Sequence, residues 1–281
     1  MSPSPIFDTH CHLNFKRFKK SLDQVIQASR AAGIGYFVIP GTDIKSSQTA
    51  IQIAKQYDGI YASVGIHPHH VFNYIDHPDQ ISVDIKRLKQ LSQDPTVVAI
   101  GEVGLDLHDY QHTKYPNYHT NPEFLKRQQQ VLTCQLEIAI DSQLPVIIHN
   151  RQAAPQILQL LQNNWQPQLD GKCIFHCCEP NQAILDFAIQ HNCYLGVDGD
   201  ITYDQQKQQF ITQIPDNLLL IETDSPYLLP EPLRTQRQFP NTPANLPIII
   251  GEIAAFRHTD PENLIGQTTQ NALRAFDLRS F

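Results

Sequence analysis

The chain is poor in positive charge and has no long hydrophobic run. Its 281 residues carry 21 Lys and Arg against 28 Asp and Glu, so it lacks the basic surface typical of proteins that bind duplex nucleic acid along the backbone. No run approaches the roughly 18 apolar residues that a membrane-spanning helix needs. The first residues show no charged leader followed by an apolar stretch, as a signal peptide would. We therefore expect a cytoplasmic protein that contacts any nucleic acid only locally.

Sequence signatures of several other protein classes are also missing. The six cysteines form no Cys-x-x-Cys pair, and four lie in or beside predicted strands, where reduced cysteine acts as a small apolar residue. There is no Gly-rich phosphate loop, and no spacing singles out a Ser–His–Asp or cysteine nucleophile. The composition favours a reduced protein whose chemistry, if it has any, depends on other side chains.

Short apolar runs alternate with helical patterns along the chain. The runs predict eight strands, near residues 5–9, 34–39, 60–64, 96–100, 145–148, 172–176, 193–197 and 218–223. Helical periodicity separates them near 21–32, 46–57, 80–92, 122–142, 152–163, 180–191 and 204–213, and the tail from residue 244 looks helical in two pieces. This alternation predicts a single (β/α)8 TIM barrel over residues 1–281. An open doubly wound sheet is the alternative, but it gives no reason for polar residues at so many strand ends. A polar stretch at 108–121 is the best candidate for a substrate-side lid or insertion.

Six residues of metal-binding type fall at the ends of predicted strands. They are His10, His12, Glu102, His149, His176 and Asp224. Barrel enzymes carry their sites at the C-terminal rim of the strands, so we expect the six to converge on one metal site there. Alternation of side chains puts both histidines of His-Cys-His on one side of the chain. A carboxylate at position 102 can bridge two ions, which an imidazole cannot do.

The donor types predict which ions and which roles fit. Imidazoles mixed with few carboxylates suit Zn²⁺, Mn²⁺, Ni²⁺, Co²⁺ or Fe²⁺ and argue against Ca²⁺, while Mg²⁺ fits when substrate phosphate supplies oxygens. Asp224 can bind an ion through one oxygen and accept a proton with the other. His67 is expected to donate to a substrate oxygen. Arg151 is expected either to grip a phosphate or to pair with a rim carboxylate. Asp8 is expected to orient a ring.

The remaining histidines near the predicted strand ends carry no such signal. We expect them to be solvated loop residues, and they are His69, His70, His108, His112 and His119.

As a set, these motifs resemble the TatD family of metal-dependent deoxyribonucleases, within the amidohydrolase-like barrels. The similarity runs through residues 7–13, 65–68, 101–106, 144–151, 175–177, 222–228 and 243–247. It implies one divalent cation held by His10, His12, Glu102 and Asp224, and a second held by Glu102, His149 and His176. It also implies a two-metal hydrolase of DNA phosphodiesters that acts from a 3′ end and prefers single strands. Glu102 would hold the ions together, and Asp224 would serve as base.

Three segments depart from the usual pattern of that family. They are residues 107–109, residues 178–180 and Thr242, which stands where the family usually has glutamate. These segments lie where substrate should sit, so two alternatives stay open. One is a carboxylic-ester hydrolase of the same fold, such as a D-aminoacyl-tRNA deacylase. The other is a metal-binding scaffold that has lost catalysis. No membrane and no obligatory protein partner is expected.

Overall fold

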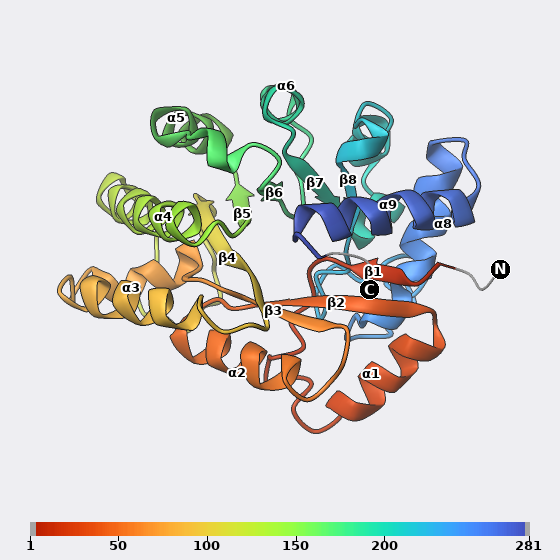
Figure 1. The fold of residues 1–281 in the computed structure, drawn as a ribbon, viewed down its shortest axis with the longest axis horizontal. Coiled ribbons are helices and arrows are strands. Elements are labelled where there is room, and N and C mark those ends of the chain that lie inside the picture. The colour runs from red at the N-terminus through yellow and green to blue at the C-terminus, as the bar shows by residue number, and fades with distance from the viewer. Residues whose placement is uncertain (1–3, 279–281) are drawn as a thin grey trace.

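Parallel strands pair in the order of the sequence across residues 4–278, the part of the chain that the computed structural model describes. They are β1 (Ile6–Asp8), β2 (Ile34–Pro40), β3 (Ile60–Val64), β4 (Val97–Asp106), β5 (Val146–Arg151), β6 (Cys173–Phe175), β7 (Tyr194–Val197) and β8 (Leu219–Ile221). A parallel bridge between Cys11 and Ser225 joins the chain after β8 to the chain after β1. The sheet is therefore nearly closed, and the predicted barrel is confirmed (Figure 1).

Helices surround the sheet at positions close to the predicted ones. They are α1 (Leu22–Ala31), α2 (Ile44–Ala54), α3 (Gln80–Leu91), α4 (Pro122–Ser142), α5 (Ala154–Asn164), α6 (Gln182–His191), α7 (Gln205–Ile211), α8 (Leu246–Phe256) and α9 (Pro261–Ala275). Local chemistry fixes several starts. Before α4, the Asn121 side chain accepts a hydrogen bond from the Phe124 backbone amide, and Pro122 occupies the first turn. Asp43 and Ser46 form a capping box at α2.

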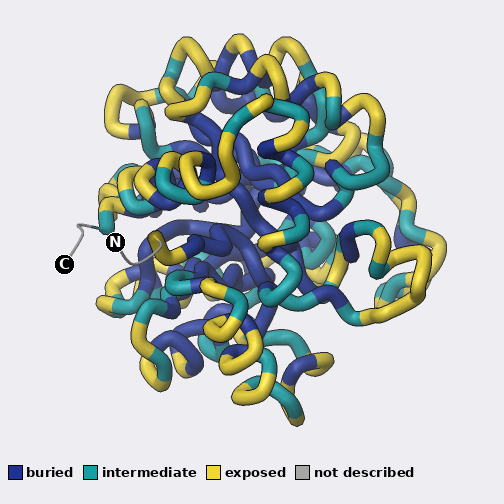
Figure 2. The backbone as a smooth tube through the Cα atoms, turned by 90° about the vertical axis from the view of Figure 1, so that its right-hand side faces the viewer, coloured by how far each residue is buried: buried dark blue, intermediate teal, exposed yellow. Residues whose placement is uncertain are grey.

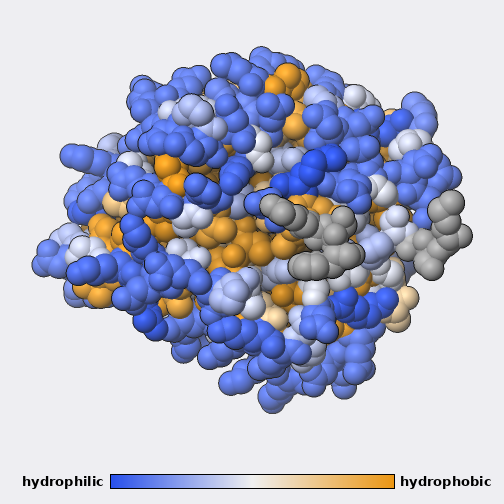
Figure 3. Space-filling view, viewed as in Figure 1, coloured by the Kyte–Doolittle hydropathy of each residue, from blue (hydrophilic) through white to orange (hydrophobic). Residues whose placement is uncertain are grey.

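Alternate residues of each strand pack on opposite sides of the sheet. Ile147 belongs to the apolar cluster inside the barrel, whereas its neighbours Val146 and Ile148 belong to the larger cluster beneath the helices. Helix α9 closes the end at which the strands begin, because Phe276 stacks on Phe7 at 5.8 Å. Figure 2 shows the buried backbone at the centre, and Figure 3 shows hydrophobic colour gathered at the centre of a hydrophilic face.

Two strands extend farther than the apolar runs predict. β4 continues to Asp106 and β5 to Arg151, and these two residues pair in register. Gly104 permits this, because a Cβ atom there would lie 1.9 Å from the carbonyl oxygen of His149. Glu102 and His149 therefore lie within strands and not in the loops after them. His149 pairs with Gly104, whereas Glu102 lies at a register shift of β4, where its amide donates to the Gly41 carbonyl at 2.8 Å.

The 108–121 segment is irregular and packs on the short helix η1 (Pro68–Tyr74). Its Tyr115 hydroxyl lies 2.9 Å from Nδ1 of His70, and its Thr113 hydroxyl lies 2.8 Å from Nε2 of His69. The prediction that His69 and His70 are solvated is therefore wrong, since the segment covers both rings. His108 is also half-buried, and the other two histidines of the segment are exposed as predicted.

Two further findings concern the described part of the chain. No helix within residues 4–278 combines the length and hydrophobicity that crossing a membrane requires. All six cysteines are free, and four of them are buried.

Candidate metal centre

The site lies inside the barrel at the end where the strands finish. His149 comes two residues after Ile147, and His176 two residues after Ile174, and both isoleucines point into the barrel. Because strand side chains alternate with period two, each histidine continues the inward-facing side of its strand. The carboxyl ends of all strands meet at one rim, so these side chains converge.

A first group of donor atoms comes from the chain after β1, from β4 and from the chain after β8. The Nε2 atoms of His10 and His12 lie 3.3 Å apart, and Glu102 Oε2 lies 3.4 Å and 3.6 Å from them. Asp224 Oδ1 lies 3.8 Å and 3.3 Å from the same nitrogens. Ligands of one tetrahedral ion at the usual bond lengths lie about 3.3–3.6 Å apart. His10, His12 and Glu102 are thus spaced closely enough to share one ion, and Asp224 lies within 3.8 Å of both histidines.

A second group of donor atoms uses the other oxygen of Glu102. Its Oε1 lies 2.9 Å from His149 Nδ1 and 2.8 Å from His176 Nε2, and these two nitrogens lie 3.2 Å apart. His67 Nε2 lies 3.2 Å from the same oxygen. The carboxylate of Glu102 therefore faces two sets of donors with two different oxygens. The structure brings together all six residues predicted to bind metal.

Imidazole rings determine the charge state of the buried Glu102. Burial alone would raise the pKa of its carboxyl group, but His67 and His176 hold that pKa well below its usual range. Burial lowers the pKa of His10, so its ring is neutral and can donate a lone pair to a cation. The arrangement combines an ionised carboxylate with a neutral imidazole, which are the forms that bind metals.

Asp106 is a member of the site that the sequence analysis did not single out. Its Oδ2 lies 3.1 Å from His149 Nε2 and accepts a hydrogen bond of 2.7 Å from the Tyr110 hydroxyl. Burial lowers the pKa of His149, but Asp106 and Glu102 together raise it to about 9. Its position in the sequence could have indicated this role, because Asp106 follows Glu102 by four residues on one fully buried strand.

Arg151 lies at the rim beside this network. Its guanidinium donates to the Tyr110 hydroxyl at 3.1 Å and lies over the ring of that tyrosine, 5.3 Å from the centroid. Within residues 4–278 it forms no ion pair, so the predicted pairing with a rim carboxylate is wrong. An aromatic residue of the 108–121 segment holds it instead.

The predicted role of Asp8 is also wrong, and a different carboxylate approaches a ring. Asp8 accepts hydrogen bonds from the hydroxyl and the backbone amide of Thr223, at 2.6 Å and 3.1 Å, so it fixes the chain after β8. The buried Glu222 lies 3.6 Å from His176 Nδ1 and accepts a hydrogen bond of 2.5 Å from the Cys177 amide. Glu222 lies in the 222–228 motif, but the sequence does not show that its side chain points inward, because that direction depends on the register of β8.

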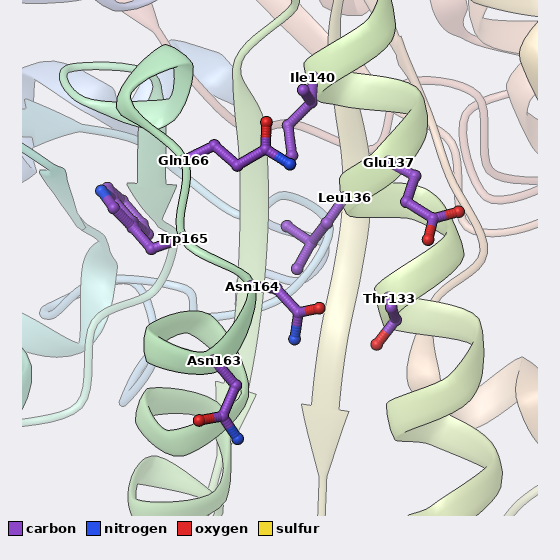
Figure 4. A pocket seen from close by; sticks show the side chains of 8 residues that line it. All are labelled: Thr133, Leu136, Glu137, Ile140, Asn163, Asn164, Trp165 and Gln166. Carbon is purple, nitrogen blue, oxygen red and sulfur yellow. The ribbon is translucent and has the colours of Figure 1, made fainter.

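A separate hollow lies on the outside of the barrel between α4 and α5 (Figure 4). It is lined by the second half of α4 and the end of α5, with residues Thr133, Leu136, Glu137, Ile140, Asn163, Asn164, Trp165 and Gln166. Helices of this barrel run opposite to the strands, so the hollow lies toward the end where the strands begin. It does not belong to the metal centre.

Known proteins resemble this chain over nearly its whole length. The sequence profile of the family described as TatD related DNase matches residues 7–277. An Escherichia coli K12 protein named 3'-5' ssDNA/RNA exonuclease TatD is 32% identical over 279 residues, which cover 97% of this chain and 99% of that protein. The uncharacterized metal-dependent hydrolase YabD of Bacillus subtilis is 32% identical over 273 residues, with coverages of 96% and 98%.

A solved structure agrees with these sequence matches. The crystal structure of YJJV, a TatD homolog from Escherichia coli K12, superposes with a TM-score of 0.82 at 25% identity and covers 98% of each chain. The resemblance drawn from the motifs is therefore confirmed. The chain belongs to the TatD-related DNase family and is a metal-dependent hydrolase.

Proposed function

We propose that this enzyme is a two-metal phosphodiesterase that shortens single-stranded nucleic acid, chiefly DNA, from its 3′ end. The observation that carries the proposal is that the two oxygens of Glu102 face two separate sets of donor atoms. Relatives named 3'-5' ssDNA/RNA exonuclease, such as that of Salmonella typhimurium at 33% identity over 279 residues, support the choice of substrate.

The residues present fit two divalent cations. Glu102 and Asp224 are buried, and within residues 4–278 no lysine or arginine pairs with either carboxylate. A buried carboxylate needs a compensating cation. Burial lowers the pKa of His149 and His176, but neighbouring carboxylates, Glu102 among them, raise both, so protonated rings supply that charge in the metal-free protein and divalent cations would take the place of their protons. His10, His12 and Asp224 would hold one ion, His149 and His176 would hold the other, and Glu102 would contact both. When bound, such ions lower the pKa of water and offset charge on a phosphoryl group.

Side chains of the rim would do the remaining work. Asp224 Oδ2 makes no hydrogen bond within the described residues, so it is free to accept a proton while Oδ1 faces the histidines. His67 Nε2 lies 3.2 Å from Glu102 Oε1, and Arg151 is the last residue of β5, the strand that also carries His149. We assign these two residues to the phosphoryl oxygens of the substrate, to which Arg151 can donate through its guanidinium and His67 through Nε2, because Nδ1 of His67 accepts from the His69 amide.

The test uses single-stranded DNA labelled at either end, with protein reconstituted in Mn²⁺, Mg²⁺, Zn²⁺, Co²⁺ or Ni²⁺. We expect stepwise shortening from the 3′ end, and a loss of at least about a hundredfold in Glu102→Gln and Asp224→Asn. Glu137→Gln is the matched control, because that carboxylate is exposed on α4 and remote from the site. No cleavage with any metal, together with hydrolysis of a D-aminoacyl-tRNA ester, would refute the proposal and favour the ester hydrolase.

A further inference from the structure

A short run of cations follows the metal centre directly, in a chain whose net charge is −7. Lys16, Arg17, Lys19 and Lys20 provide four of the 21 basic residues, and all four are exposed. No acidic residue occurs between Asp8 and Asp23. The acidic total therefore conceals a local positive surface at the rim.

These cations are held at a fixed place beside the site. The backbone amide of His12 donates to the Ser225 carbonyl at 2.8 Å, and consecutive turns follow, with the Phe15 amide donating to the His12 carbonyl at 3.1 Å. Phe18 is 1% exposed and anchors the middle of the run in the core. Its neighbours must then point outward, because the chain reverses in tight turns around one buried side chain.

Two aromatic rings pack beside His12, one of the candidate metal-binding residues. Phe15 stacks on the imidazole of His12 with the ring centroids 4.3 Å apart. Tyr227 packs edge-on against both rings, 6.2 Å from Phe15 and 6.3 Å from His12. Tyr227 is 55% exposed, one of four large hydrophobic residues left open to solvent in the described chain. An exposed ring that borders a catalytic group has a face available for a ligand.

The charges of the run are not used inside the protein. Some surface cations have carboxylate partners, as Lys89 has with Asp141 at 2.7 Å and Lys55 with Asp94. None of the four cations of the run takes part in an ion pair within residues 4–278. They remain available for an external anion, and all four lie within one short segment, residues 16–20.

We infer that Phe15, Tyr227 and the cations of residues 16–20 form a track for single-stranded nucleic acid that leaves the metal centre. The inference rests on the proposed function and adds the path of the polymer: with the 3′ end in the site, the rings stack a base and the cations contact phosphates on its 5′ side. Stacked rings next to an unpaired cationic run are what sequence-tolerant single-strand binding requires. Because the rest of the chain carries a net negative charge, we expect the nucleic acid to contact the protein only along this track.

The chain itself supplies a matched control for the cations. Residues 86–89 on α3 repeat the pattern of residues 16–19, with lysine, arginine, a buried apolar residue and lysine. They lie in the second half of α3, which runs toward the end of the barrel where the strands begin. Changing Lys16, Arg17 and Lys19 to glutamine alters net charge as much as changing Lys86, Arg87 and Lys89 does.

The first experiment measures steady-state cleavage of oligothymidylates from two to twelve nucleotides by the metal-loaded enzyme, beside bis(p-nitrophenyl) phosphate. In the variant of residues 16–19 we expect KM for the twelve-nucleotide substrate to rise about tenfold or more at low salt. The slope of log KM against log salt should fall by about 2, since each phosphate contact to a single strand contributes about 0.7. Cleavage of the small diester should not change, and the α3 variant should behave as the native enzyme.

A second variant tests the aromatic part of the track. Tyr227→Ala should weaken binding of a twelve-nucleotide phosphorothioate, followed by fluorescence anisotropy, by about tenfold, and Tyr227→Phe should restore it because the ring is retained. If the variants at both parts match their controls while the native enzyme cleaves DNA, the track is refuted and the nuclease stands. If the native enzyme binds the phosphorothioate through these residues and cleaves no DNA, the track stands and the proposed function fails.

Discussion

Replacing Asp106 by asparagine should weaken binding of the cation that His149 helps to hold. The carboxylate lies 3.1 Å from Nε2 of that ring, so it fixes the ring orientation and leaves Nδ1 facing Glu102. Asparagine has the same shape and can still accept the hydrogen bond of 2.7 Å that Tyr110 donates. Loss of a charged partner behind a metal-binding imidazole costs about 10- to 100-fold in metal affinity, or about 1.4–2.7 kcal/mol.

Competition against a chromophoric chelator measures this affinity. The titration is run at several pH values on both sides of about 9, the pKa of His149, because proton displacement from that ring contributes to the apparent metal affinity. Asp109→Asn is the control, since that exposed carboxylate hydrogen-bonds only to Thr120. Equal affinities for both cations in the Asp106→Asn and native proteins would refute the role assigned to Asp106.

Three further predictions concern protonation and stability. The pKa of His149 lies at about 9, above the usual 6.5, so at neutral pH the metal-free ring is protonated. The pKa of His176 is raised as well, so metal loading should release protons from both rings, affinity should rise with pH up to about 9, and calorimetry in two buffers should show fewer protons released in His149→Gln than in the native protein. Phe18→Ala should cost about 3–5 kcal/mol in urea unfolding, and Phe239→Ala, at a side chain 57% exposed, should cost little. Lys207→Ala should cost about 3–5 kcal/mol because it leaves the buried Asp198 and the half-buried Asp200 without their cation; a loss below about 1 kcal/mol would contradict that account.

The fold could be predicted from local patterns, because each strand of the barrel is a short apolar run and each crossover is an amphipathic helix. The ends of β4 and β5 could not be predicted in this way. Glycine and polar residues interrupt the apolar run there, and the last residues stay in the sheet because each strand pairs with the other as far as Asp106 and Arg151. Pairing between strands is a tertiary property that a single sequence does not display.

The convergence of the six candidate metal-binding residues could also be predicted, since each occupies an equivalent place at a strand end. The supporting carboxylates could not be assigned correctly. Asp8 and Glu222 both lie in motifs at strand ends, yet the first bonds to Thr223 and the second approaches His176. Which carboxylate meets a ring depends on the register of β1 against β8, where only isolated contacts join the sheet. The local positive charge of residues 16–20 could not be predicted from the net charge, because net charge sums over the whole chain.

The most direct test of the account is whether one carboxylate joins two cations. Electron paramagnetic resonance of protein loaded with two equivalents of Mn²⁺ reports this, because ions bridged at about 3.5–4 Å couple to each other. The account predicts a coupled spectrum for the native protein and the spectrum of isolated Mn²⁺ for Glu102→Gln. Isolated Mn²⁺ in the native protein, or saturation at one equivalent, would contradict it.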